Sequence, residues 1–313
     1  MKKVGICFSK ELQGVKPLGH IGTKLPVYLR LLDFMKNAGW EVYVLTRKTY
    51  KNNGVFEGGW RYDGGSFLLT NEKLTIDLVY DRTGGIDFPP ESDNLLVVNP
   101  RNFKILCWDK WATFKEIEEF MPKTLLIENE KQIAPFLSEI KSDKIVLKPF
   151  NGLKGLGVFI GDKDEALDFK FPEKYSKYVM QEFVNTSGGI PGITSERHDL
   201  RVAVVNQKVV WCHVRVPKEG SLMANAAQGG SLTEVDYEKV PKSVKNIVEV
   251  ISRKFYNKYG NTIYSLDFGV EKDGTPKIFE INDQIGFPKW DMKEKDSFLL
   301  GLISNFKQKL EEK

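Results

Sequence analysis

Two strand-like segments on either side of Asp273-Gly274 constrain the fold of this 313-residue chain more than any other feature. Apolar and polar residues alternate along 264–271 and again along 276–283. Such alternation is typical of strands that bury one face, and an Asp-Gly pair between two of them is a strong signal of a two-residue turn. The sequence therefore predicts an antiparallel hairpin in which the numbers of paired residues have a constant sum.

The predicted pairing places Asp267 directly opposite Glu280. Successive side chains of a strand point to opposite faces, so Glu280 and Asn282 are expected on the face of Asp267. The other face is expected to carry the apolar side chains of Leu266, Phe268, Phe279 and Ile281.

This arrangement suggests a metal site. Like charges directly opposed across a sheet are destabilising, and a divalent cation between them reverses that effect. Oxygen atoms of Asp267, Glu280 and Asn282 suit Mg²⁺ or Mn²⁺ and leave coordination positions open for phosphate. The alternative is a solvated polar face on an amphipathic hairpin, and the segment alone does not decide between the two.

The charge and cysteine content narrow the class of protein. The 46 basic and 42 acidic residues give a net charge of +4 and are interspersed, which favours neither a nucleic-acid nor a membrane surface. The apolar run 4–8 is too short for a signal peptide and is predicted to be the first β-strand. Cys7, Cys107 and Cys212 lie in apolar contexts, which fits reduced thiols in a cytoplasmic protein.

Three units are predicted along the chain. Residues 1–105 alternate strands and helices from a βαβ start, and their loop 10–24 follows the first strand, where open α/β sheets bind ligands. Residues 106–184 form a second unit of α+β type. Residues 185–313 form a third, which begins with a flexible loop at 185–198.

A glycine-rich loop follows the strand that ends near Pro149. Gly152, Gly155 and Gly157 permit positive φ and close approach of backbone N–H groups to phosphate oxygens. A Walker loop and a dinucleotide fingerprint would both enter a helix, whereas this loop enters the strand 158–160, so both motifs are excluded. The loop is either a lid over phosphates or a simple turn.

Lys148 is a single cation in a strand that is otherwise apolar on both faces. A buried lysine is costly unless it is paired, and a bound phosphate is a suitable partner. The alternative is a lysine on an edge strand whose ammonium reaches solvent.

The ordered set of motifs resembles the ATP-grasp superfamily, especially bacterial glutathione synthetase and the ribosomal-protein glutamate ligases. The match runs without interruption from about Val97 to Asn282. Its pieces are Trp108–Thr113, Leu147–Pro149 with the glycine loop, Gln181–Val184, Asp199–Val202, Val214–Pro217, Asn225–Gly230, Leu266–Phe268 and Phe279–Asn282. The resemblance implies an ATP-grasp fold of mixed α/β (α+β) class, with an N-terminal βαβ domain and two α+β subdomains that clamp ATP.

The resemblance also implies roles for individual residues. Lys110 and Lys148 would contact the α- and β-phosphates beneath the glycine loop, and Asp199 would lie near the ribose. Gln181 would belong to the ATP site, and the backbone of the hinge Glu182, Phe183 and Val184 would contact adenine.

The remaining implied roles concern the reaction itself. Arg201 and Arg215 would neutralise the transferring phosphoryl group and the acyl phosphate, and Asn225 with Gly229 and Gly230 would hold substrate or intermediate. Asp267, Glu280 and Asn282 would hold two Mg²⁺ ions. Arg215 alternates with His213 and Trp211 and so shares their face, where a planar cation suits phosphate or carboxylate. Its alternative role is a structural salt bridge with a surface acid.

The implied enzyme is an ATP-dependent carboxylate–amine ligase that forms an amide through an acyl phosphate and releases ADP and phosphate. Its partners would be a small-molecule or peptide carboxylate and an amine, and related ligases are often homo-oligomers. A small-molecule kinase of the same fold and a non-catalytic nucleotide-binding module are the alternatives.

The chain departs from the glutathione synthetases after Asn282, where Phe287 and Trp290 replace a loop of small residues. This departure implies a different acceptor pocket and puts glutathione itself in doubt. In the N-terminal unit, Arg82 either holds a substrate carboxylate or belongs to a structural turn at a strand end.

Overall fold

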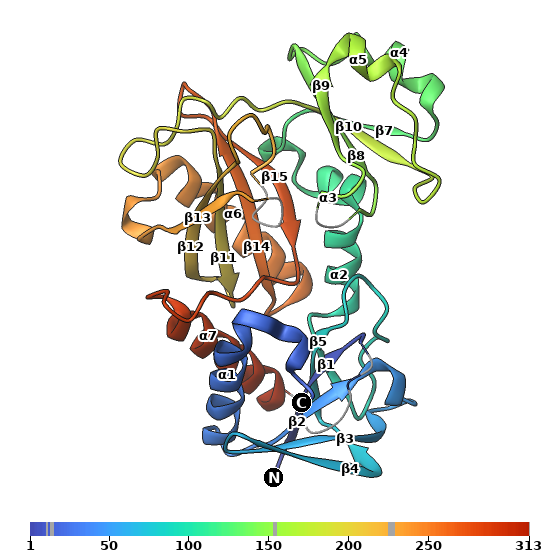
Figure 1. Cartoon of the computed structure of the whole chain (residues 1–313), viewed down its shortest axis with the longest axis vertical. Helices are drawn as coiled ribbons and strands as arrows, with labels where there is room; N and C mark the ends of the chain where they lie inside the picture. Colours follow the sequence, from blue (N-terminus) through green and yellow to red (C-terminus); the bar gives the residue numbers. More distant parts are fainter. Residues whose placement is uncertain (11, 13–15, 153–154, 225–228, 313) are drawn as a thin grey trace.

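The computed structural model describes residues 1–10, 12, 16–152, 155–224 and 229–312. Their strands form three sheets, and Figure 1 shows the first at the bottom, the third at the upper left and the second at the upper right. Besides the longer helices given below, the chain forms 3-10 helices η1 (Gly19–Lys24), η2 (Arg47–Thr49), η3 (Glu118–Phe120), η4 (Glu130–Gln132) and η6 (Tyr237–Lys239).

The first sheet has the strand order β4-β3-β2-β1-β5-β6. Its strands are β1 (Lys3–Phe8), β2 (Glu41–Thr46), β3 (Val55–Asp63), β4 (Ser66–Thr75), β5 (Leu78–Arg82) and β6 (Leu96–Val98). β1, β2, β5 and β6 are parallel, and the predicted βαβ start is present, with α1 (Leu25–Asn37) between β1 and β2. α1 carries a proline in its first turn and ends before Gly39, whose φ of 86° suits the residue that follows a helix.

The second sheet is antiparallel, with the order β7-β10-β8-β9. Its strands are β7 (Thr124–Ile127), β8 (Lys144–Pro149), β9 (Phe159–Asp162) and β10 (Tyr178–Glu182), accompanied by α4 (Ile133–Leu137) and α5 (Lys163–Leu167). The helices α2 (Arg101–Trp108) and α3 (Lys110–Ile117) lead into this sheet. Asp109 separates them and caps α3, because its carboxylate accepts a hydrogen bond from Ala112 N at 2.8 Å.

The third sheet is also antiparallel, with the order β13-β12-β11-β14-β15. Its strands are β11 (Asp199–Val205), β12 (Lys208–Val216), β13 (Ser231–Glu234), β14 (Ile263–Val270) and β15 (Pro276–Asn282), and α6 (Lys242–Tyr259) supplies Val244, Val248, Ile251 and Phe255 to the core on one of its faces. The three sheets fall within the three predicted sequence ranges, whose boundaries stay predictions.

The last helix, α7 (Lys295–Glu311), returns to the first sheet, where Figure 1 shows it beside α1. Its Phe306 packs against Trp40 and Tyr80, and Arg30 of α1 forms a bidentate ion pair with Asp296, with distances of 2.6 and 2.5 Å. The first and third sheets are therefore joined by a shared apolar core as well as by the chain.

Asn99 forms a second joint between these two sheets. Its side chain accepts a hydrogen bond from Ile263 N at 2.7 Å and donates to the carbonyl oxygens of Ile263 and Asp283, at 2.6 and 3.0 Å. Because buried amides are costly to leave unpaired, these bonds fix the start of β14 and the end of β15 against the first sheet.

The hairpin of β14 and β15 confirms the pairing of Asp267 with Glu280, although the predicted turn is wrong. The loop has three residues, closed by a bond from Glu271 N to Thr275 O, and Gly274 takes a φ of 87° as its last residue. A bulge then restores the predicted pairing, because Phe268 pairs with Ile278 while Asp267 pairs with Glu280.

Because of this bulge, the prediction that Phe279 lies on the apolar face of β15 is wrong. Ile278 enters the core with Ile281, whereas Phe279, expected on that apolar face, lines a pocket with Glu280. The strand therefore presents an aromatic ring beside a carboxylate.

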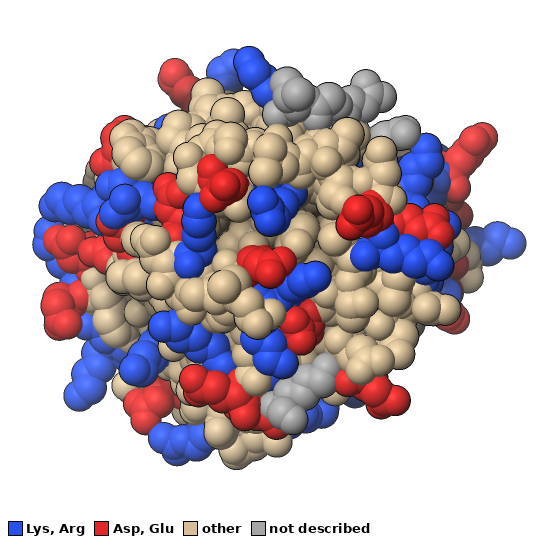
Figure 2. All heavy atoms as spheres, turned by 90° about the horizontal axis from the view of Figure 1, so that it is seen from below, with Lys and Arg blue, Asp and Glu red and all other residues tan. Residues whose placement is uncertain are grey.

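The surface charges are mixed. On the face seen from below, Lys and Arg side chains are interspersed with Asp and Glu (Figure 2). Cys7, Cys107 and Cys212 are buried and free, as expected. In the part of the chain that is described, no helix has the length and apolarity needed to span a membrane.

Candidate active site

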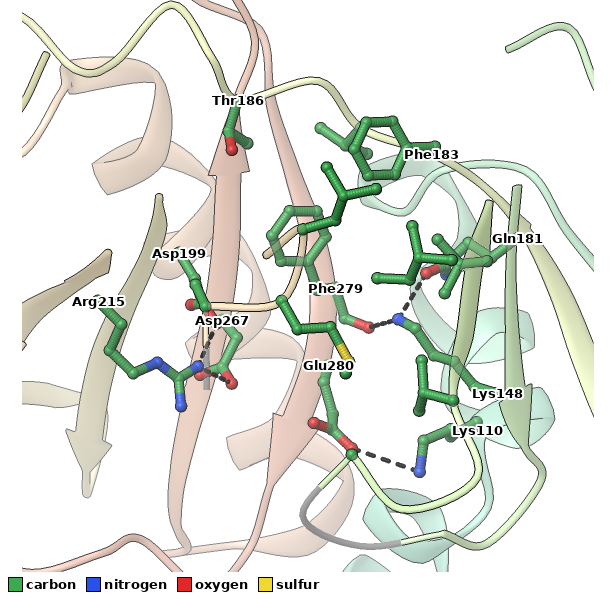
Figure 3. Close-up of a pocket in the computed structure, with 18 of the residues that line it drawn as sticks. Lys110, Lys148, Gln181, Phe183, Thr186, Asp199, Arg215, Asp267, Phe279 and Glu280 are labelled. Carbon is green, nitrogen blue, oxygen red and sulfur yellow. Dashed lines mark hydrogen bonds and ion pairs between the residues drawn. The ribbon is translucent and has the colours of Figure 1, made fainter. Parts of the chain in front are cut away.

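A pocket lies between the second and third sheets and encloses about 1010 Å³ of empty space, part of which is open to solvent. Figure 3 shows the cationic side chains of Lys148 from β8 and Lys110 from α3 on one side and an acid–arginine cluster from the third sheet on the other.

One part of the pocket is apolar. It is lined by Val146, Leu156, Val158, Ile160, Phe183, Leu222, Met223 and Phe279. The guanidinium of Arg197 lies 5.5 Å from the centre of the Phe183 ring, which places a planar cation at this wall. Flat apolar surfaces with backbone groups of the hinge 182–184 nearby suit a planar heterocycle.

Lys148 projects from β8 into the pocket (Figure 3). Its ammonium donates to Gln181 Oε1 at 2.7 Å and to the Phe279 carbonyl oxygen at 3.2 Å. The Gln181 amide donates in turn to Thr124 Oγ1 at 2.9 Å, which fixes its oxygen toward the lysine. Burial lowers the pKa of Lys148 to about 8, so the charged form lacks full compensation and would gain from an anionic ligand.

Lys110, at the start of α3, joins the glycine loop to β15. Its ammonium donates to Gly152 O at 2.8 Å and lies 3.3 Å from Glu280 Oε1. Its backbone N–H donates to Phe150 O at 3.1 Å, which ties the same loop to the helix. The two pocket lysines are thus held by different elements and meet on one side of the cavity (Figure 3).

Arg215, Asp199 and Asp267 line the opposite side of the pocket, and Arg201, outside the lining, belongs to the same cluster through Asp267. Arg201 forms a bidentate pair with Asp267, with distances of 2.6 and 2.5 Å. Arg215 donates to Asp267 at 2.8 Å and also to Asp199. Both acidic partners of Arg215 line the pocket. Arg215 therefore does not form the salt bridge with a surface acid that was its alternative role.

The electrostatics of this cluster differ between its two acids. Burial by itself would raise the pKa of Asp267, but the Arg201 and Arg215 guanidiniums outweigh burial and hold that pKa well below its usual range. Burial raises the pKa of Asp199, an effect that Arg215 opposes and the Asp267 carboxylate increases. Asp267 is therefore the firmly ionised member of the pair.

His213 and Trp211 share the face of Arg215, as the alternation of β12 predicts, and their rings lie 4.2 Å apart. Burial, together with the charges of Arg201 and Arg215, lowers the pKa of His213 well below its ordinary value. A neutral imidazole therefore lies beneath the arginines.

The predicted metal ligands lie together on neighbouring strands. Asp267 pairs with Glu280, and the Asn282 amide lies 3.3 Å from Asp267 Oδ2. No group of three or more His, Cys, Asp and Glu side chains suited to a metal occurs among the described residues, so Asn282 is needed for a third protein ligand. Both carboxylates are bound to cationic side chains here, and their oxygen atoms fit a hard divalent cation.

Most of the other predicted residues line this one pocket. These are Lys110, Lys148, Gly152, Gly155, Gln181, Glu182, Phe183, Val184, Asp199, Arg215, Asp267 and Glu280. Gly157 lies outside the pocket lining, in the turn that leads to β9, and its carbonyl oxygen accepts a hydrogen bond from Tyr178 at 3.1 Å. Gly229 and Gly230 precede β13 outside the lining, and Asn225 falls outside the described residues.

The loop 185–198, predicted to be flexible, supplies pocket residues that the sequence did not indicate. Thr186, Arg197 and His198 line the cavity. Thr186 Oγ1 accepts a hydrogen bond from His198 N at 3.0 Å, and His198 Nε2 accepts from Val270 N at 3.1 Å. The loop is thereby held against β14. No local sequence pattern in 185–198 predicts these contacts. By contrast, the position of Val146 in the pocket could be predicted, because it lies two residues from Lys148 on the same strand and shares its face.

Arg82 lies apart from this pocket, at the end of β5 in the first sheet. It donates to the Tyr80 hydroxyl at 3.3 Å, and its guanidinium lies 5.3 Å from the centre of the Phe287 ring. Phe287 is buried, whereas Trp290 is 49% exposed.

Two curated relatives align with part of the chain. A probable alpha-L-glutamate ligase of Legionella pneumophila is 27% identical over 118 residues, which cover 37% of this chain and 36% of the relative. The glutathione synthetase of Shewanella oneidensis is 32% identical over 114 residues, which cover 36% of this chain and 35% of the relative. The chain thus aligns with about a third of the length of these two proteins.

Solved structures match over nearly the whole chain. D-alanyl-alanine synthetase A from Vibrio cholerae has a TM-score of 0.65 at 12% identity and covers 100% of this chain and 99% of its own. The ATP-grasp ligase PsnB, solved with a phosphomimetic variant of its minimal precursor, Mg and ADP, has a TM-score of 0.60 at 13% identity, with 96% and 98% covered. At these identities the likeness establishes the ATP-grasp fold.

A family match covers the part of the chain that holds the pocket. Residues 104–295 match the family described as RimK-like ATP-grasp domain. This range includes both pocket lysines, both arginines and the hairpin of β14 and β15. The chain therefore belongs to the RimK-like ATP-grasp family.

Proposed function

We propose that this protein is an ATP-dependent ligase that joins a carboxylate to an amine through an acyl phosphate. The observation that carries the proposal is the arrangement of one pocket, in which Lys110 and Lys148 face Arg215 and Asp267 across the cavity (Figure 3). The names of the curated relatives, a glutamate ligase and a glutathione synthetase, support the same class of reaction.

In this proposal the adenine occupies the apolar part of the pocket, against Phe183 and Phe279, with the hinge backbone at its edge. Lys148 and Lys110 bind phosphate oxygens, and the glycine loop around Gly152 closes over them. The lysines are preorganised by Gln181 and by the loop carbonyl, so little side-chain freedom is lost when ATP binds.

Asp267, Glu280 and Asn282 would hold one or two Mg²⁺ ions, with Mn²⁺ as a substitute. The metal would supply charge neutralisation for the β- and γ-phosphates and would keep the donor and acceptor oxygens close together. Arg201 and Arg215 pair with Asp267, and Lys110 pairs with Glu280, so cationic side chains fix the positions of the two carboxylates that would hold the metal.

The chain's own residues then act by positioning and by neutralising charge. A carboxylate oxygen of the acid attacks the γ-phosphorus, the bond to the β-phosphate oxygen breaks, and ADP leaves. Arg215 and Arg201 stabilise the charge that develops on the transferring group and on the acyl phosphate. The amine then attacks the acyl carbon, loses a proton and expels phosphate. Leu222 and Met223, which line the pocket from the loop before β13, help exclude water from the intermediate.

Hydroxylamine offers a direct test, because it captures an acyl phosphate whatever the natural amine is. ADP and hydroxamate are measured with Mg·ATP, hydroxylamine and a panel of amino acids, peptides and other carboxylates. Hydroxamate from one class of acid supports the ligase. ADP without hydroxamate on every acid indicates a kinase, and ATP binding without ADP indicates a nucleotide-binding module.

The three buried thiols support a reducing, cytoplasmic location for this reaction.

A further inference from the structure

A second cationic region lies where the first sheet meets the loop after β15. Lys24, the last residue of η1, donates to Phe287 O at 2.6 Å, and a Cβ atom at Gly286 would lie 3.5 Å from its ammonium. Arg82, from the end of β5, places its guanidinium 5.3 Å from the centre of the Phe287 ring. Phe287 is buried and stacks on Tyr28 with 4.1 Å between ring centres, so it is a rigid platform for both cations.

Among the described residues, the cations of this region outnumber their acidic partners. Within the described residues, no carboxylate lies within ion-pair distance of Lys24, Arg82 or the exposed Lys289. The nearby Asp283 is 3.4 Å from the buried ammonium of Lys104, which also pairs with Asp81 at 2.5 Å, so Asp283 offsets part of the charge of Arg82, whereas Lys24 and Lys289 have no acidic partner among the described residues. By contrast, Arg201, Arg215 and Lys110 in the pocket all have acidic partners.

The two cations also keep unused hydrogen-bond donors. An ammonium has three N–H groups, and Lys24 uses one on the Phe287 carbonyl. A guanidinium has five, and Arg82 has a tyrosine hydroxyl for a partner rather than an acid. Burial, together with the charges of Arg82, Arg201 and Lys289, lowers the pKa of Lys24 to about 8. The chain links this region to the reaction site, because Asn282 contacts Asp267, and Phe287, five positions later, accepts the hydrogen bond from Lys24.

We infer that Lys24 and Arg82, with Lys289 at the rim, bind a second and non-reacting anionic group of the acid substrate, which is therefore a dianion such as a dicarboxylic acid. This inference rests on the proposed ligase function and specifies its acid. One carboxylate of the acid lies near Arg201 and Arg215 and is phosphorylated, while the other pairs with Lys24 and Arg82 and fixes the register of the substrate.

The charge pattern assigns this group to the acid rather than to the amine. An amine arrives largely as an ammonium ion at neutral pH, and the excess positive charge of Lys24, Arg82 and Lys289 repels it. An acid with two negative charges is attracted by the same field. Bidentate contacts from Arg82 suit the planar geometry of a carboxylate.

The test compares acids that have the same shape and differ by one charge. Hydroxamate formation is measured with N-acetylglutamate against N-acetylglutamine, and with glutarate against its monoamide, using hydroxylamine as the amine. The wild-type protein is expected to prefer each dianion by about 10-fold or more in kcat/KM, in keeping with hydrogen bonds to charged groups. Equal rates with the charged and neutral partners would overturn the inference while leaving the ligase function intact.

Substitutions test whether Lys24, Arg82 and Lys289 cause the preference for a dianionic acid. Arg82→Met and Lys24→Met should each raise KM for the dianion by about 10-fold, with a smaller change in kcat and little effect on the monoamides. Arg82→Lys should restore part of the loss. Lys289→Met, at an exposed position where folding is not at risk, should raise KM by about two- to five-fold. Lys307→Met, which removes an exposed charge on α7, is the matched control and should leave KM unchanged.

A second measurement separates this inference from the ligase function. Calorimetric titration of N-acetylglutamate and of N-acetylglutamine is carried out in the presence of Mg²⁺ and a non-hydrolysable ATP analogue. Tighter binding of the dianion, weakened by Lys289→Met, supports the site even if no acid gives hydroxamate. Equal binding of the two ligands, or tighter binding that survives in Lys24→Met, Arg82→Met and Lys289→Met alike, would overturn it.

Discussion

The guanidinium of Arg215 donates to Asp267 at 2.8 Å and also to Asp199, and so joins the carboxylates of two neighbouring strands, β14 and β11. Asp267 has a second arginine, Arg201, at 2.5 Å, so its charge does not depend on Arg215 alone. Arg215 is therefore the member of this cluster that can turn toward a substrate without leaving Asp267 unpaired.

Removal of Arg215 should consequently affect the rate more than the binding of ATP. Arg215→Ala is expected to lower kcat about 100-fold or more, because it removes a preorganised group that stabilises developing negative charge. Arg215→Lys should retain part of the activity, since it keeps the charge and loses the planar fork. Steady-state kinetics with varied ATP provide the measurement, and Arg253→Ala, on the exposed face of α6, is the control. A change confined to KM would argue against the assigned role.

Glu280→Gln tests the metal ligands. The substitution keeps the shape of the side chain and removes its charge, so ATP turnover is expected to fall steeply and the Mg²⁺ concentration needed for half-maximal activity to rise. The fold should persist, because the Glu280–Lys110 pair is partly exposed and its contribution to stability is small. Thermal unfolding of the two proteins without metal checks the second point. Unchanged ATP turnover would show that Glu280 holds no essential metal.

The binding of ATP should weaken as pH rises through about 8. Burial lowers the pKa of Lys148 to about 8, and a bound polyphosphate favours its charged form, so the protonated lysine that binds well is lost above that pH. Dissociation constants for Mg·ATP measured from pH 6.5 to 9.5 should show this trend in the wild type and a flatter profile in Lys148→Met. Lys24→Met is a matched control, since the pKa of Lys24 is also lowered to about 8 although this residue lies outside the nucleotide pocket. An equally steep profile in Lys148→Met would exclude Lys148 as the titrating group.

Gly269 gives a test of the bulge in β15. A Cβ atom at this position would lie 2.2 Å from the Phe279 ring and 2.8 Å from Thr186 Cγ2, so Gly269→Ala must displace the ring that lines the pocket. We expect a loss of about 1–3 kcal/mol in the free energy of unfolding and weaker binding of ATP. Phe279→Leu combined with Gly269→Ala should recover part of the loss in stability. Gly19→Ala, where a Cβ atom meets nothing within 4 Å, serves as the control. Full stability in Gly269→Ala would contradict the packing of Phe279 described above.

The sequence predicted the parts of the site that depend on local alternation. Asp267 and Glu280 pair as expected, and Arg215 shares a face with His213, because strands alternate with a period of two. The predicted two-residue turn and the predicted face of Phe279 are wrong for the same reason. A three-residue loop and a bulge shift the register in opposite directions, and an Asp-Gly pair is compatible with either loop length.

Contacts between distant segments could not be predicted in the same way. Residues of the loop 185–198 reach the pocket because His198 accepts a hydrogen bond from Val270, 72 positions away. The convergence of Lys24, Arg82 and Phe287 likewise depends on how the first and third sheets pack, which no local pattern encodes. Tertiary packing rather than propensity decided these positions.

The central claim is that the acid is activated as an acyl phosphate, and transfer of ¹⁸O tests it most directly. The acid that gives the fastest hydroxamate formation is labelled in its carboxylate, and the phosphate released during amide formation is examined by mass spectrometry. One labelled oxygen should appear in each phosphate, because the oxygen that attacks ATP leaves with the phosphoryl group. Amide formation with unlabelled phosphate would contradict the account.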